Sequence, residues 1–134
     1  MATSVQYEAF RESWRPTQEK VDLAVKLAVE IAKPSRVFVF GSWARGAAGI
    51  DSDLDLAVFL PDAMKPIGGD IEDRLLEVLD DLPMSIDLVV AFEGTVKDFS
   101  ASVNSIFCRI LREGKLVYEQ PSKDHKDQGR DAAA

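Results

Sequence analysis

Apolar residues recur every three or four positions in three segments of the chain, which predicts three amphipathic helices. The first segment lies within residues 17–34, where Lys33 and Pro34 end the helix. The second covers residues 70–82, and the third covers residues 102–113 with Gly114 as its C-cap. The apolar faces of these helices consist of Val21, Ala24, Val25, Ala28, Ala32, Ile71, Leu75, Val78, Leu79, Leu82, Val103, Ile106, Phe107, Ile110 and Leu111.

Four short runs rich in β-branched and aromatic residues alternate with these helices and predict four strands. They are RVFVF at residues 36–40, LDLAVFL at 54–60, MSIDLVVAF at 84–92 and KLVYE at 115–119. In the second run the even-numbered residues form a wholly apolar face, because side chains alternate across a strand. A short helix is expected to begin at Ser42, directly after the first strand.

The element order predicts an α/β (α+β) domain with a small mixed β-sheet and helices packed against it. An antiparallel arrangement of the first two strands would bring Gly41 and Asp53 to the same end of the sheet. The third strand follows a helical crossover and is expected to run parallel to the second. We assign residues 17–119 to this domain, residues 1–16 to an N-terminal extension with a short helix, and residues 120–134 to a flexible polar tail.

Polar residues interrupt the strands at a few positions, which predicts a site at one end of the sheet. Asp53 and Asp55 are two residues apart and point the same way, and Asp87 lies early in the neighbouring strand. Carboxylates this close stay ionised only beside a cation, and oxygen ligands favour Mg²⁺ or Mn²⁺. Gly41 and Ser42 end the first strand and start a short helix, a combination that suits a phosphate group.

Composition limits the choice of partners and compartment. The chain of 134 residues carries a formal net charge of −7, which argues against broad nucleic-acid binding. Its single cysteine, Cys108, favours a reducing compartment. The N-terminal residues do not resemble a signal peptide, and no apolar run approaches the roughly 20 residues of a membrane helix. The sequence therefore predicts a cytoplasmic protein without membrane contact.

The string GSWARGAAGIDSDLDLAV at residues 41–58 resembles the nucleotidyltransferase signature of the DNA polymerase beta superfamily. It is most similar to the minimal nucleotidyltransferase (MNT) domains, antitoxins that are paired with HEPN toxins. The resemblance implies the polymerase beta-like nucleotidyltransferase fold. It also implies that Asp53, Asp55 and Asp87 are catalytic and hold two Mg²⁺ or Mn²⁺ ions. It further implies nucleotide contacts from the residues Gly41, Ser42 and Arg45.

The same resemblance implies an enzyme that transfers AMP from ATP, or a nucleoside monophosphate from another NTP, to a hydroxyl on a HEPN-domain protein. Two alternatives stay open from the sequence. The chain could be a binding module that neutralises a partner by complex formation alone, or a nucleotidyltransferase that acts on a small molecule. A surface salt bridge of Arg45 is as compatible with the sequence as a phosphate contact. The strand at residues 115–119 could pair with a second copy of the chain if it lies at a sheet edge.

Overall fold

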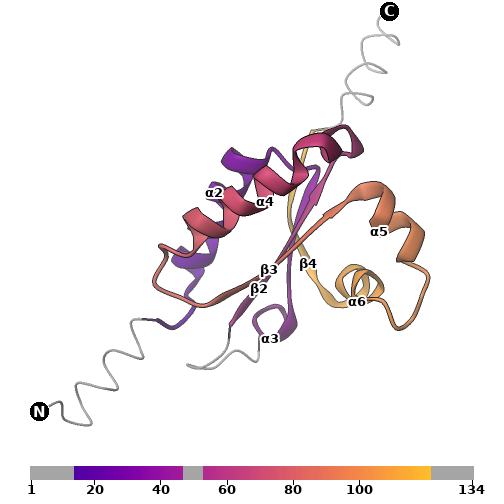
Figure 1. Ribbon diagram of the computed structural model, residues 1–134. Helices are drawn as coiled ribbons and strands as arrows, with labels where there is room; N and C mark the ends of the chain where they lie inside the picture. Colours follow the sequence, from indigo (N-terminus) through magenta and orange to yellow (C-terminus); the bar gives the residue numbers. More distant parts are fainter. Residues whose placement is uncertain (1–13, 47–52, 122–134) are drawn as a thin grey trace, which may run out of the picture.

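The computed structural model describes residues 14–46 and 53–121, which fold into a four-stranded sheet with helices on both faces (Figure 1). The strand order is β3-β2-β1-β4. The strands are β1 (Arg36–Phe40), β2 (Leu54–Leu60), β3 (Ile86–Phe92) and β4 (Lys115–Glu119). The helices are α2 (Gln18–Ala32), α3 (Gly41–Ala44), α4 (Gly68–Leu79), α5 (Glu93–Phe99) and α6 (Ile106–Glu113), with a 3₁₀ helix η1 (Asp62–Ile67).

The sheet is mixed, as the sequence predicts. β1 runs antiparallel to both β2 and β4, whereas β2 and β3 run parallel. The crossover between the two parallel strands consists of η1 and α4. The predicted fold class, a small mixed sheet with helices packed against it, is confirmed.

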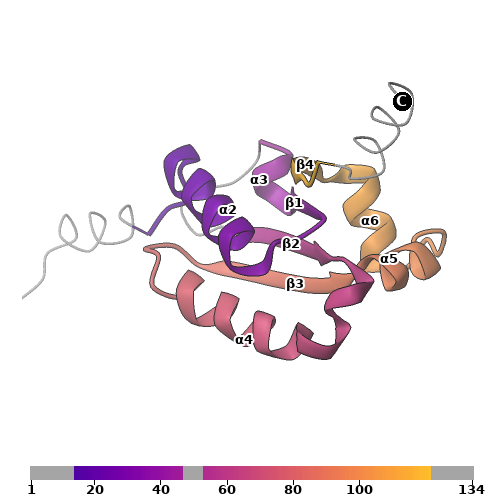
Figure 2. The same ribbon diagram turned by 90° about the horizontal axis from the view of Figure 1, so that it is seen from above.

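Helices α2 and α4 cover one face of the sheet, and α5 and α6 lie on the other (Figures 1 and 2). Because side chains alternate along β2, this strand contributes to an apolar cluster on each face of the sheet. Its even-numbered residues are fully buried under α2 and α4, whereas Ala57 and Phe59 join Phe38 and Ile110 on the opposite face. The buried even-numbered residues are Leu54, Leu56, Val58 and Leu60.

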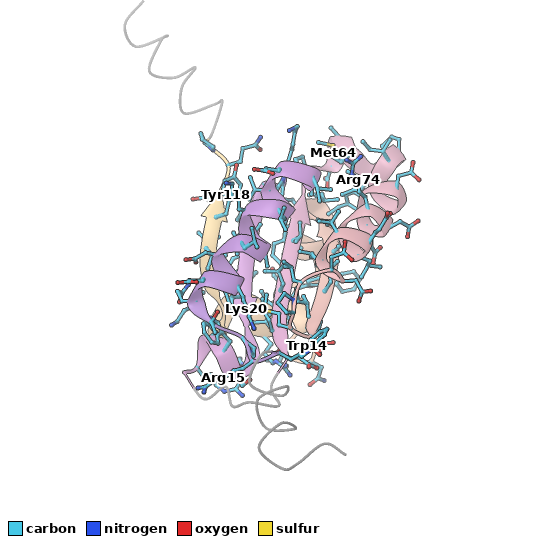
Figure 3. All side chains as sticks on the ribbon, turned by 90° about the vertical axis from the view of Figure 1, so that its left-hand side faces the viewer. Trp14, Arg15, Lys20, Met64, Arg74 and Tyr118 are labelled. Atoms are coloured by element: carbon cyan, nitrogen blue, oxygen red, sulfur yellow. The ribbon has the colours of Figure 1, made fainter. Side chains whose placement is uncertain are left out.

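The first helix confirms its predicted ends. Thr17 caps α2, since its side-chain oxygen accepts a hydrogen bond from the Lys20 N–H at 3.2 Å. Lys33 ends it in the left-handed conformation with a φ of 45°. The Lys20 ammonium donates hydrogen bonds to the carbonyls of Arg15 and Pro83 and so ties the start of α2 to the segment before β3. Figure 3 shows Arg15, Lys20 and Trp14 at this end of the molecule. No helix in the described ranges combines the length and apolar character that a bilayer span requires.

Three helical segments differ from the prediction. Helix α4 begins at Gly68, two residues before the predicted start, and follows directly on η1, which has no predicted counterpart; a side chain at Gly68 would overlap the ring of Phe92. Helix α5 has no counterpart in the prediction. Helix α6 begins at Ile106 rather than at residue 102, because the Ser105 hydroxyl accepts from the Cys108 N–H and caps it there.

The late start of α6 changes which of its predicted apolar residues are buried. Val103 precedes the helix and is 73% exposed, and Ile106 is 42% exposed. Ile110 is fully buried, with Phe107 and Leu111 packed around it. Residues 4–13, which hold almost all of the short helix expected in the N-terminal extension, Asp51 and the tail after residue 121 lie outside the described residues. The boundaries proposed for the domain thus stay predictions.

Strand β4 lies at an edge of the sheet, the condition under which the sequence predicts pairing with a second copy. Leu116 and Val117 are 47% and 42% exposed there. The register with β1 also contains an irregularity opposite Val37 and Phe38, and such bulges commonly protect edges from pairing. A homo-oligomer therefore stays a prediction.

An ion pair joins β1 to α5 at the end of the sheet where β3 finishes. The Arg36 guanidinium donates two hydrogen bonds to the Glu93 carboxylate, at 2.9 and 2.8 Å, and the Ser35 hydroxyl donates a third. Burial alone would raise the pKa of Glu93, but the hydrogen bonds from Arg36 and Ser35 lower it below its ordinary value despite the nearby charge of Asp62.

The lowered pKa of Glu93 predicts an acid-sensitive contribution to stability. An acid with a lowered folded-state pKa stabilises the fold above its unfolded value of 4.5, and this contribution is lost as the pH falls through the folded value. We expect Glu93→Gln to cost about 1–2 kcal/mol at pH 7 and less near pH 3. Urea denaturation of both proteins from pH 7 to pH 3 measures the difference. Glu72→Gln, on the exposed surface of α4, is the control, and a penalty for Glu93→Gln that is independent of pH would contradict the interpretation.

Candidate functional site

The candidate site lies at the end of the sheet where β1 finishes and β2 and β3 begin (Figure 1). Asp55 pairs with Phe40 in the antiparallel register and with Asp87 in the parallel one. Gly41 follows Phe40 directly and starts α3. The structure therefore brings together Gly41, Asp55 and Asp87, which are far apart in the sequence.

Asp55 and Asp87 form a carboxylate pair on the face of the sheet that also carries α5 and α6. On their strands they alternate in step with Ala57 and with Ala91, which pack on this face. Burial raises the pKa of Asp55 above its ordinary value, and the charge and hydrogen bond of Asp87 raise it further. The pair therefore favours either a shared proton or a bound cation.

Gly41 is required by the position of Asp55. Its φ is +71°, a left-handed conformation that L side chains rarely adopt. A Cβ atom at this position would overlap Oδ2 of Asp55 and lie 3.0 Å from its Cγ. The absence of a side chain at residue 41 thus leaves room for the carboxylate beside Asp87.

Helix α3 is a single turn that begins at Gly41, one residue before the predicted start. Ser42 is half-buried, and Arg45 is exposed at the C-terminal end of the turn, where its N–H donates to the Gly41 carbonyl at 3.2 Å. Trp43 is half-buried and packs against the apolar cluster that contains Val21 and Val39. The salt bridge considered for Arg45 does not form with any residue in the ranges 14–46 and 53–121.

Asp53 lies one residue before β2 and is exposed. Its negative charge contributes to the raised pKa of Asp55. Within the described part of the chain, however, no three His, Cys, Asp or Glu side chains are close enough to hold a metal ion as they stand. The arrangement is a close pair with a third acid beside it, rather than the compact trio that the sequence suggests.

The donor set fits a hard divalent cation. Only carboxylate oxygens face one another at the pair, which suits Mg²⁺ or Mn²⁺ better than softer metals. A cation between Asp55 and Asp87 would remove the repulsion that raises the pKa of Asp55. The residues present are therefore compatible with the metal ligation that the resemblance implies.

A basic residue that the sequence analysis missed also acts on the site. Arg109 of α6 lowers the pKa of Asp55 through its positive charge and so opposes the effect of the two other acids. Nothing in the local sequence marks it, since Arg109 is one of several exposed charged residues of an amphipathic helix. Only the packing of α6 on the Asp55 face identifies it.

The model of the nucleotidyltransferase domain family matches residues 21–112, a range that contains every candidate site residue. No curated protein sequence is detectably similar to the chain. Similar solved structures include a toxin–antitoxin complex with AMP-PNP, at 21% identity over 78% of this chain and 77% of that chain, with a TM-score of 0.47.

Two further structures show similar levels of likeness. One is a putative nucleotidyltransferase from Sulfolobus solfataricus, at 21% identity over 78% of this chain and 91% of that chain, with a TM-score of 0.44. The other is a tri-AMPylated Shewanella oneidensis HEPN toxin in complex with MNT antitoxin, at 20% identity over 83% of this chain and 76% of that chain, with a TM-score of 0.44. Because the family match spans more than half of the sequence, this chain belongs to the nucleotidyltransferase domain family.

Proposed function

We propose that this protein transfers a nucleoside monophosphate, AMP from ATP, to a hydroxyl group on a partner protein. The observation that carries the proposal is the Asp55–Asp87 pair beside Gly41, inside the segment that matches the nucleotidyltransferase family. An acidic pair whose oxygens could ligate a divalent cation, next to a turn that suits phosphate, serves transfer of a phosphorus-centred group.

The acids would hold the metal and the turn would hold the nucleotide. Asp55 and Asp87, with Asp53 beside them, would ligate two Mg²⁺ or Mn²⁺ ions. When bound, these ions neutralise negative charge on the triphosphate and make the α-phosphorus more electrophilic. The Ser42 hydroxyl would donate a hydrogen bond to a phosphate oxygen, and Arg45, which has no ion-pair partner among the described residues, would supply positive charge.

The transfer itself is a substitution at the α-phosphorus. The oxygen of the acceptor hydroxyl forms a new bond to phosphorus as the bond to the bridging β-phosphate oxygen breaks, and pyrophosphate leaves. Asp87 would receive the hydroxyl proton, and its support for that role is its position opposite Asp55 in the same carboxylate pair. The chain thus supplies the base, and the products are AMP-modified acceptor and pyrophosphate.

We further propose that the acceptor is a tyrosine hydroxyl of a HEPN toxin and that this protein is its cytoplasmic antitoxin. The support is the resemblance of residues 41–58 to the MNT antitoxins. The formal net charge of −7 is compatible with a basic partner, since opposite charge favours encounter. A small domain also has little surface from which to build a separate pocket for the acceptor.

Incubation with ATP labelled at the α-phosphate, Mg²⁺ and a HEPN-domain protein from the same organism tests the proposal. We expect label on the partner with the wild-type protein, and none with the Asp53→Asn/Asp55→Asn double variant or with ATP labelled at the γ-phosphate. Absence of label with the wild type would contradict transfer. If the double variant still neutralised the toxin in cells, complex formation alone would explain the antitoxin role.

A further inference from the structure

The C-terminal half of α6 lies against the part of the sheet that carries the site. Ile110 is fully buried in the same apolar cluster as Phe40 and Ala57, the neighbours of Gly41 and Asp55 in sequence and register. At the end of the helix, Gly114 packs so closely on β1 that an added Cβ would lie 3.3 Å from Cβ of Phe40. Figure 1 shows α6 and α3 near the same end of the sheet.

Arg109 is an uncommitted cation on this helix. Its side chain is exposed, and it forms no ion pair or side-chain hydrogen bond with any residue that the structure describes. Arg36 is instead bound to Glu93, and Arg112, one turn further along α6, is paired with Glu113 at 3.4 Å. Helix α6 packs on the face of the sheet that carries the acidic pair, and the charge of Arg109 lowers the pKa of Asp55, so the guanidinium lies within electrostatic reach of the site.

An uncommitted arginine beside an acidic pair is suited to a ligand that brings its own negative charge. The triphosphate of a bound nucleotide adds charge at a place that already holds Asp53, Asp55 and Asp87. A divalent ion on the acids would leave Arg109 free of their attraction. Its planar guanidinium can then bind two phosphate oxygens at once, a geometry that lysine does not offer.

We propose that Arg109 binds the β- and γ-phosphates of the nucleotide and stabilises the pyrophosphate as it leaves. This inference rests on the nucleotidyl transfer proposed above and concerns the same site. It gives α6 a role in selecting a nucleoside triphosphate over a monophosphate. Because charge develops on the leaving group during transfer, the contact would strengthen as the bond to the α-phosphate breaks.

Binding of AMP-PNP and AMP in the presence of Mg²⁺, measured by calorimetry, tests this role in the full chain. We expect Arg109→Gln to weaken AMP-PNP binding about 10- to 100-fold and to change AMP binding less than about twofold. Arg109→Lys should show an intermediate loss, because it keeps the charge and loses the planar fork. Arg112→Gln, on the same helix and already paired with Glu113, is the matched control and should bind like the wild type.

Two results would overturn the proposal: an equal loss of affinity for both nucleotides, or no loss for either. An equal loss would mean that Arg109 only balances the charge of Asp55. Should Arg109→Gln fail to fold, Arg109→Lys decides alone. If Arg109→Lys then preferred AMP-PNP over AMP by the same factor as the wild type, the phosphate contact would be contradicted. If the preference for AMP-PNP over AMP depends on Arg109 but no AMP is transferred to the HEPN protein, the proposed acceptor is wrong. The proposed contact between Arg109 and the phosphates would still hold.

Discussion

Replacing Asp55 by asparagine is expected to abolish nucleotidyl transfer and, at the same time, to raise the melting temperature of the ligand-free protein. Transfer should fall by about a thousandfold or more, since metal assistance contributes several kcal/mol and each factor of ten corresponds to about 1.4 kcal/mol. The ligand-free protein should become more stable, because asparagine lacks the negative charge that burial and the neighbouring Asp87 both disfavour.

The gain in stability is modest because the site is partly open to water, which screens the charges. We expect a rise of roughly 2–4 °C, measured by differential scanning calorimetry without divalent ions. Glu72→Gln, which removes an exposed acid from α4 beyond its first turn, is the control and should change neither property. A variant at Asp55 that is both inactive and less stable than the wild type would show that Asp55 supports the fold rather than opposing it.

Replacing Gly41 by alanine is expected to cause the second large loss of activity, by about a hundredfold or more. The new methyl group would overlap Oδ2 of Asp55, and the carboxylate can avoid it by rotating away from Asp87. A misplacement of about 1 Å at a catalytic group can cost two orders of magnitude in rate. Transfer assays with labelled ATP measure the loss.

Gly46 offers a matched control for the backbone strain of this substitution. It also has a positive φ, of +72°, but nothing lies within 4 Å of a Cβ placed there. Both alanine variants should therefore lose stability by a similar amount, about 1 kcal/mol, from the left-handed conformation alone. Only Gly41→Ala should lose activity. Equal activity in the two variants would show that the space beside Asp55 has no catalytic importance.

The strand pattern predicted the architecture of the site, because side-chain alternation and strand pairing allow few arrangements of Gly41, Asp55 and Asp87. The short connection after Gly41 required β1 and β2 to be antiparallel for the two motifs to meet. The helical crossover predicted the parallel partner of β2, which placed Asp87 opposite Asp55. These inferences needed only the period of a strand and the handedness of a crossover.

The helices on the Asp55 face were harder to predict, because their signals are short or ambiguous. Helix α5 has seven residues, includes Gly94, and buries one of them, Val96, so it carries no periodic stripe. The apolar Val103 and Ile106 suggested an earlier start for α6, but the Ser105 cap decides it. For this reason Arg109 could not be assigned to the site from the sequence.

The reason for Gly41 also became clear only in three dimensions. The sequence suggests that a glycine lets phosphate approach the backbone, which is a statement about the ligand. The structure adds a reason within the protein, since Oδ2 of Asp55 occupies the place of a side chain. Such an overlap depends on the pairing of β1 with β2, and no local pattern contains it.

Binding of Mn²⁺ in the presence of AMP-PNP, followed by the electron paramagnetic resonance signal of the free ion, tests the central claim most directly. If Asp55 and Asp87 together hold the catalytic cation, the wild-type protein should take up Mn²⁺, and Asp87→Asn should lose at least about tenfold in affinity. Asp70→Asn should retain the wild-type affinity. Equal uptake of Mn²⁺ by the wild type and Asp87→Asn would contradict the account.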